Sequence, residues 1–171
     1  FMRKTTDPAG GNGYAYIRQA QFNALSRIKN GGMAVTIDIG NDRDIHPKAK
    51  KQVGERLARW ALARDYGKDI VPSGPLFKSA KIEEGKIRIS FDYVGTGLMV
   101  GVKKATDNLE PQEAPKGTPL KGFAIAGKDQ VWHWANAVID GDTVVVSSDK
   151  VPSPRYVRYA FRAFPQGDCN L

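Results

Sequence analysis

His46 and the carboxylates that closely precede it are the residues of this chain whose types and spacing could do chemistry. Asp38, Asp42 and Asp44 stand shortly before this imidazole in the sequence. An imidazole next to a carboxylate has the layout of the base end of a hydrolytic triad, in which the ring accepts a proton from a nucleophile. No nucleophile accompanies His46 in this stretch, so the pattern predicts one half of an active site.

The elements that would position His46 are a helix, a strand and a second helix. Apolar residues recur at helical spacing over residues 14–29, and the sequence Asn-Gly-Gly at 30–32 would end that helix. The short β-branched and apolar run 33–39 is typical of a buried parallel strand. Pro47 suits the first turn of the next helix, whose apolar positions share one face until residues 66–67. This order predicts the closing part of an α/β layer, where ligands gather beyond the C-terminal ends of strands.

From residue 71 onward the helical period is lost, and the sequence predicts an antiparallel β-sandwich. Residues 72–75 form a Pro- and Gly-containing linker, and two alternating strands meet around Glu84 and Gly85. Further strands are expected at residues 122–126, 131–139, 143–147 and 157–161. Residues 103–119 are expected to form a surface loop without chemistry. We therefore expect two domains, residues 1–70 and 71–171.

The composition is that of an ordinary soluble globular chain and excludes several classes of site. No stretch approaches the roughly 18 apolar residues of a membrane span. Cys169 is the only cysteine, which excludes an internal disulfide and a multi-cysteine metal site. The net charge of +8 comes largely from the second helical segment, where we expect a solvated face, with Lys48, Lys50, Lys51, Arg56, Arg59 and Arg64. We therefore expect no nucleic-acid partner, no membrane partner, no cofactor and no metal.

Three further residue types need an interpretation. His133 is expected to be structural or exposed, because it stands in an alternating strand. Trp132 and Trp134 flank it on one sheet face and could stack on sugar rings, although we expect them to pack in the core. Cys169 is expected to be a buried small apolar residue.

Several motifs resemble the C-terminal half of the sialate O-acetylesterase family, in the same order along nearly the whole chain. They include Ile37-Asp38-Ile39-Gly40, Asp44-Ile45-His46-Pro47-Lys48, Asp65-Tyr66-Gly67-Lys68, Leu120-Lys121-Gly122-Phe123 and Gly141-Asp142-Thr143-Val144. The resemblance implies an SGNH-type serine esterase, in which a flavodoxin-like catalytic domain is joined to a β-sandwich. It also implies removal of acetyl groups from carbohydrates such as sialic acids or plant cell-wall sugars, and a secreted or periplasmic location.

The resemblance implies a role for each candidate residue. His46 would be the general base, and Asp44 would orient it. SGNH enzymes usually place an aspartate three residues before this histidine, where the present chain has Arg43. Asp42 and Asp38 are therefore alternatives, and a backbone carbonyl could serve in a Ser-His dyad.

The nucleophilic serine of this family lies in a Gly-rich turn that has no counterpart in the sequence. We therefore expect the chain to be inactive alone and to need the missing N-terminal half of the catalytic domain, from the same gene product or a partner chain. The alternative is a carbohydrate-binding or structural β-sandwich that carries an inert α/β remnant.

Overall fold

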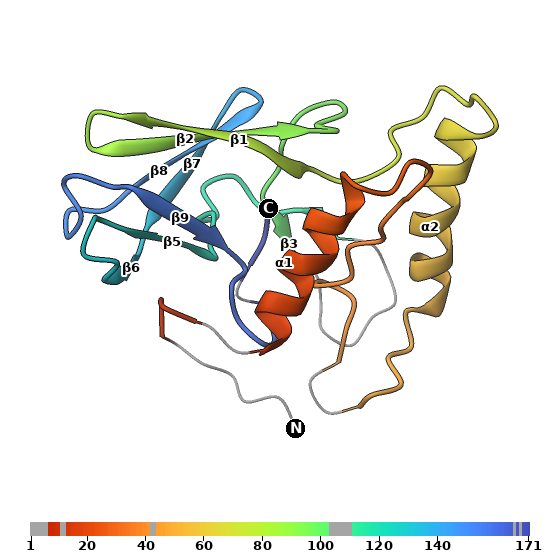
Figure 1. The fold of residues 1–171 in the computed structure, drawn as a ribbon, viewed down its shortest axis with the longest axis horizontal. Helices are drawn as coiled ribbons and strands as arrows, with labels where there is room; N and C mark the ends of the chain where they lie inside the picture. The colour runs from red at the N-terminus through yellow and green to blue at the C-terminus, as the bar shows by residue number, and fades with distance from the viewer. Residues whose placement is uncertain (1–6, 11–12, 42–43, 103–110, 166, 168) are drawn as a thin grey trace.

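The computed structural model describes residues 7–10, 13–41, 44–102, 111–165, 167 and 169–171. Two helices, α1 (Gly13–Leu25) and α2 (Lys50–Arg64), are followed by strands that form antiparallel sheets (Figure 1). The strands are β1 (Leu76–Glu83), β2 (Lys86–Asp92), β3 (Gly101–Val102), β4 (Gln112–Glu113), β5 (Phe123–Ala126), β6 (Trp132–Trp134), β7 (Asn136–Asp140), β8 (Thr143–Ser147) and β9 (Tyr156–Tyr159). Neither described helix is long and apolar enough to span a membrane.

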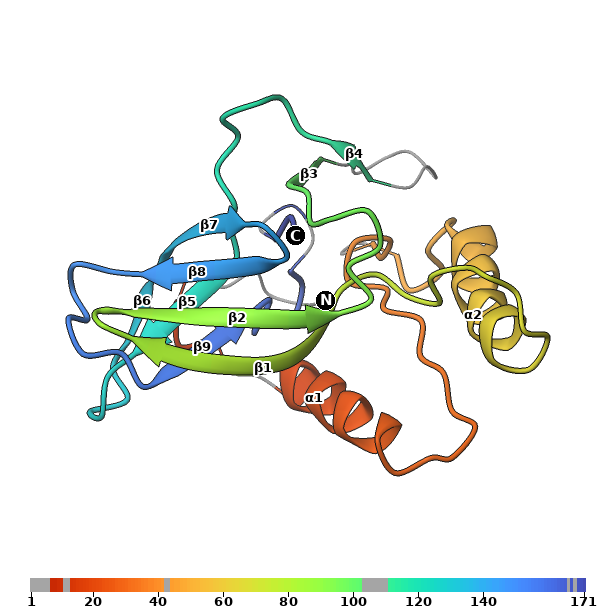
Figure 2. The same cartoon turned by 90° about the horizontal axis from the view of Figure 1, so that it is seen from above.

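Two sheets face each other and form a β-sandwich. One sheet has the strand order β1-β2-β8-β7, and the other has the order β6-β5-β9 (Figure 2). The space between them is filled by the side chains of Ile87, Ile89, Leu120, Phe123, Ile125, Val144, Val146 and Val151. This arrangement confirms that the second part of the chain is an antiparallel β fold.

The predicted strands agree with the structure where a short turn connects neighbouring strands. Strand β8 covers residues 143–147 as expected, and β1 and β2 meet at a turn in which Gly85 adopts a φ of +66°. Only glycine adopts this left-handed conformation without strain, which explains the hairpin at this point. Residues 131–139, in contrast, were expected as one strand and form two.

The break between β6 and β7 falls at Ala135, where the chain crosses from one sheet to the other. The amide of Ala135 donates a hydrogen bond to the carbonyl of Phe123. Part of the loop expected at residues 103–119 is a strand. Strand β4 lies within this range and pairs with β3, which directly precedes it. Residues 103–110 of that loop lie outside the described part of the chain.

The strand expected at residues 33–39 is absent, and this prediction was wrong. Residues 33–36 have no regular secondary structure, and residues 37–39 form a turn. A central strand needs neighbouring strands to satisfy its amides and carbonyls. Every strand pair among the described residues is antiparallel and lies beyond residue 75, so no neighbour is available to this segment.

Side chains of α2 bind the carbonyls of this segment instead. The indole N–H of Trp60 donates to the carbonyl of Met33 at 2.9 Å, and Arg56 donates to that of Val35 at 2.6 Å. Arg64 donates to the carbonyl of Gly31 and stacks on the Trp60 ring, 4.4 Å from its centroid. The exposed basic face that we expected is thus correct for Lys48, Lys50, Lys51, Arg59 and Arg64, although Arg64 also holds Gly31, and it is wrong for Arg56, which is half-buried.

The boundaries of both helices differ by a few residues from those expected. Helix α1 ends at Leu25 instead of residue 29, and α2 begins at Lys50, three positions after Pro47. Ala49 is the N-cap of α2 and is buried, with 5% of its surface exposed. The connection that leads to α2 is therefore longer than predicted.

Helix α1 is attached directly to the β-sandwich. Arg18 of α1 donates hydrogen bonds to the carbonyls of Ala160 at 2.8 Å and Arg162 at 2.6 Å. The rings of Tyr16 and Phe161 meet edge to face, with 5.2 Å between their centroids. The expected boundary at residue 70 therefore stays a prediction, although the two parts on either side of it touch.

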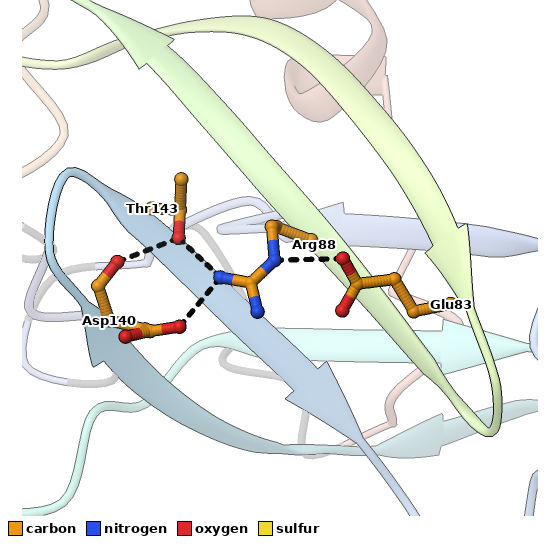
Figure 3. Close-up of polar contacts among 4 residues, drawn as sticks. All are labelled: Glu83, Arg88, Asp140 and Thr143. Atoms are coloured by element: carbon orange, nitrogen blue, oxygen red, sulfur yellow. Dashed lines mark hydrogen bonds and ion pairs between the residues drawn. The ribbon is translucent and has the colours of Figure 1, made fainter.

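A charged network crosses one sheet of the sandwich. Arg88 on β2 donates to Glu83 on β1 at 2.9 Å, to Asp140 on β7 at 2.7 Å and to Thr143 on β8 at 2.8 Å (Figure 3). The hydrogen bond from Arg88 lowers the pKa of the Glu83 carboxyl, and the bonds to Glu83 and Asp140 raise the pKa of Arg88. The network thus connects all four strands of this sheet.

Candidate functional site

The turn at residues 37–39 precedes the His46 loop, and an ion pair holds this turn against α2. Both carboxylate oxygens of Asp38 accept hydrogen bonds from the guanidinium of Arg56, each at 2.7 Å. The same guanidinium reaches the carbonyl of Val35. Bidentate pairs of this kind are stronger and more directional than single hydrogen bonds. The ion pair therefore fixes residues 35–38 at a defined distance from α2, on the side from which the His46 loop departs.

His46 itself lies in an exposed loop between this turn and α2. The backbone N–H of His46 donates to the carboxylate of Asp44 at 2.8 Å, and the side chain of Ile45 is 89% exposed. A side chain that accepts from a backbone amide two residues later forms an Asx turn, which stabilises a loop locally. The imidazole of His46 has no hydrogen-bond partner within the described residues.

The candidate partners of His46 differ in what their carboxylates bind. Asp44 shares a turn with His46, but its carboxylate binds the His46 backbone and not the ring. Asp38 is occupied by Arg56, and Asp42 lies with Arg43 outside the described residues. Asp44 is therefore the candidate that the structure brings nearest to His46 in the described chain.

This arrangement can accept a proton from a group that approaches from outside. An exposed imidazole is accessible to a hydroxyl on another segment, and catalytic hydrogen bonds often tighten only when the complete site is assembled. Within the described ranges, no group of three or more His, Cys, Asp or Glu side chains could hold a metal ion.

Trp132 and Trp134 are not in the hydrophobic core, which corrects our expectation. The guanidinium of Arg158 lies 3.8 Å from the centroid of the Trp132 ring, and that of Arg162 lies 4.7 Å from Trp134. An arginine side chain therefore packs against each of the two indoles. His133 is half-buried, and Cys169 is half-buried as well, whereas full burial was expected of the cysteine.

The sequence analysis did not predict the contacts of the α2 residues that hold the segment before the His46 loop. Arg56, Trp60 and Arg64 are spaced by four residues and so share one face of α2. The aromatic residue between two arginines was the available signal, because a solvated basic face has no reason to include an indole. Gly32 supports the same reading, since a Cβ there would lie 2.5 Å from Cγ of Trp60.

Comparison with known proteins relates the chain to a solved structure. No protein-family model and no curated protein matches the chain. The chain is similar to the crystal structure of a carbohydrate acetylesterase from Xanthomonas citri, with a TM-score of 0.74 and 40% sequence identity. The match covers 91% of this chain and 32% of that protein, so the chain spans about a third of the length of this relative. Both sequence and fold thus relate the chain to part of a carbohydrate esterase.

Proposed function

We propose that the chain is the part of a carbohydrate O-acetylesterase that supplies the general base. The observation that carries the proposal is the 40% identity to a carbohydrate acetylesterase over 91% of the chain. Identity at this level over the whole fold supports a shared chemistry more strongly than a likeness of fold alone. The substrate in this proposal is an O-acetylated sugar, and sialic acids belong to that class.

His46 is the general base in this mechanism. It takes the proton from a serine hydroxyl, which then attacks the acetyl carbonyl, and the resulting imidazolium protonates the leaving sugar oxygen. In the second half of the reaction the same ring activates water against the acyl-enzyme. The exposure of His46 and its lack of a partner among the described residues support this role, because the ring is available to a hydroxyl.

Asp44 is the orienting partner in this proposal. Its carboxylate is already anchored in the same turn as His46 by the backbone amide at 2.8 Å. Only one of its two oxygens accepts this bond, so the proposal assigns the other oxygen to the ring in the assembled site. Asp38 is the weaker choice, because recruiting it would break two hydrogen bonds to Arg56.

The nucleophilic serine and the oxyanion donors are supplied by further polypeptide of the same enzyme. The chain spans 32% of its relative, which leaves ample length for such a segment in the relative. The exposed apolar side chains of α1 and α2 support a contact with it, since Tyr14, Ile17 and Leu57 are each about half exposed.

The test is the hydrolysis of 4-nitrophenyl acetate by the complete enzyme and its variants. We expect His46→Ala to lower kcat by roughly a thousandfold or more, the scale of losses for catalytic triads. Asp44→Asn should lower kcat less and shift its pH profile, because the ring loses its orienting charge. Lys48→Ala, an exposed neighbour in the same connection, is the matched control and should leave kcat unchanged. A His46→Ala enzyme with the kcat of the wild type would contradict the proposal.

A further inference from the structure

A groove of about 310 Å³ lies at the edge of the sandwich, where the chain passes from β6 to β7. Its lining comes from Pro8, His133, Trp134, Asn136 and the turn 148–150 that follows β8. This volume is at the lower end of small-molecule sites, which begin at roughly 300 Å³. The groove therefore has room for a small ligand or for one unit of a polymer.

Trp134 gives the groove an exposed aromatic surface that is supported from one side. Its side chain is 42% exposed, while Arg162, whose guanidinium lies 4.7 Å from the ring centroid, is only 7% exposed. The indole is thus held by a buried cation and still reaches solvent. An exposed, immobilised indole offers a flat apolar surface at little cost in side-chain entropy. The C–H face of a pyranose ring is a natural partner for such a surface.

Three polar side chains of the groove make no polar contact with the described part of the chain. Asn136, Asp149 and Lys150 make no side-chain hydrogen bond or ion pair with other described residues. Together they provide an acceptor-only carboxylate, a donor-only ammonium group and an amide that does both. Sugar hydroxyls donate and accept hydrogen bonds, so they match this mixed set.

The charges of the groove favour a neutral ligand over an anion. Asp149 and Lys150 are neighbours with opposite charges, so their fields largely cancel at the groove. An anion would meet the carboxylate as well as the ammonium group, whereas a neutral hydroxyl can bind either.

The wall formed by Pro8 is fixed against the sandwich. Arg158 donates to the carbonyl of Ala9 at 2.8 Å. Gly10 has a φ of +55°, and a Cβ there would lie 1.8 Å from the carbonyl oxygen of Phe161. The backbone therefore approaches the sheet as closely as only glycine allows. A wall held in this way means that the groove exists before any ligand arrives, which lowers the entropy cost of binding.

From these observations we infer that the groove binds one sugar residue of a neutral oligosaccharide, with the pyranose ring stacked on Trp134 and its hydroxyls bonded to Asn136, Asp149 and Lys150. Strand β6 and helix α2 lie at opposite ends of the long axis of the molecule (Figures 1 and 2). A polymer held at β6 would be kept near the protein without occupying the loop before α2, and so its effective concentration there would rise. This inference does not require the proposed esterase activity.

The test is isothermal titration calorimetry of the protein with cellohexaose, xylohexaose and mannohexaose, and with 3′-sialyllactose as an anionic probe. We expect saturable binding of at least one neutral hexasaccharide. Trp134→Ala should weaken that binding about tenfold or more, as is typical for a central aromatic contact. Tyr156→Ala is the matched control, because Tyr156 is a 45% exposed aromatic residue on β9 of the same sheet and outside the groove.

A second variant guards against a loss of folding in Trp134→Ala. The double variant Asn136→Ala, Asp149→Ala keeps the indole and removes two polar side chains that bond to none of the described residues, so its thermal unfolding should match that of the wild type. It should bind the hexasaccharide about tenfold more weakly. The inference is overturned if no neutral hexasaccharide binds, if the groove variants bind as the wild type does, or if Tyr156→Ala weakens binding equally. Binding of sialyllactose alone, weakened by salt, would overturn it in favour of an anion site. Each of these results would leave the esterase proposal untouched, since that proposal depends on turnover.

Discussion

Phe123 and Ile125 in the sandwich are almost completely buried, whereas in the described range 31–41 Ile39 alone is buried. The sandwich is stabilised by apolar packing between two hydrogen-bonded sheets. Residues 31–38 are stabilised by side chains of α2 that donate to their carbonyls and to Asp38. Burial of apolar area is distributed over many contacts, while these hydrogen bonds are few and each depends on one donor.

This difference in packing makes the segment before the His46 loop easier to open than the sandwich. A segment with little buried apolar surface opens locally at a lower free energy than the core of its domain. The loop that carries His46 follows such a segment, and the groove at Trp134 lies on the sandwich. We therefore expect the sandwich to be rigid around the groove at Trp134 and the segment before α2 to open more easily. Three substitutions, at Phe123, Arg56 and Glu83, test this contrast between the sandwich and residues 31–38.

Truncation of Phe123 should have the largest effect on stability. Its side chain is 2% exposed in the core between the sheets, and its ring lies 4.5 Å from that of Tyr159. Phe123→Ala should lower the free energy of unfolding by about 3–5 kcal/mol, measured by urea denaturation. Val138→Ala removes an apolar side chain of β7 that is 62% exposed, and it should change the free energy of unfolding by less than about 0.5 kcal/mol. Equal losses in the two variants would show that the sandwich core does not dominate stability.

The same contrast explains which parts of the fold could be predicted from the sequence. Strand β8 and the β1–β2 hairpin follow from alternation and from a glycine turn, which are signals within a few residues. The split at Ala135 could not be found in this way, because it depends on which sheet each half joins. The run 33–39 has the composition of a strand, but composition does not reveal whether neighbouring strands are present.

For the candidate site, residue types and their order can be read from the sequence, but the contacts that each side chain makes cannot. The sequence places Asp44 next to His46, and the structure shows that this carboxylate binds the backbone and not the ring. It also offers Asp38, whose pairing with Arg56 joins residues 18 positions apart. Trp134 was assigned to the core because aromatic residues usually pack there, whereas its place on an edge strand, which only the fold reveals, leaves it exposed.

Removal of Arg56 should have an intermediate and local effect. Arg56→Met keeps the apolar stem of the side chain but leaves the Asp38 carboxylate and the Val35 carbonyl without this donor. The free energy of local opening should fall by about 1–3 kcal/mol, the cost of leaving such groups unsatisfied. Hydrogen exchange should therefore become faster at the amides of residues 33–39, while the amides of β5 and β8 keep their rates. Lys51→Met, on the same helix and with a side chain 81% exposed, is the control and should change neither set. A uniform acceleration across both regions would mean that the two regions unfold together.

The smallest effect is expected from Glu83, which tests whether surface charge adds to the stability of the sandwich. Arg88 lowers the pKa of Glu83 below its ordinary value of 4.5 in the folded protein. The ionised carboxylate therefore stabilises the fold above about pH 4.5, and this stabilisation is lost as the pH falls through the lowered pKa. Glu83→Gln should lower the Tm slightly at pH 7, and the difference from the wild type should shrink below pH 4.5. Glu84→Gln changes an exposed neighbour in the same hairpin, which makes no ion pair with the described residues, and should show no such pH dependence. If the Tm difference for Glu83→Gln instead stayed constant down to the acid limit, the Arg88 network would not act through charge, and apolar packing alone would account for the stability of this sheet.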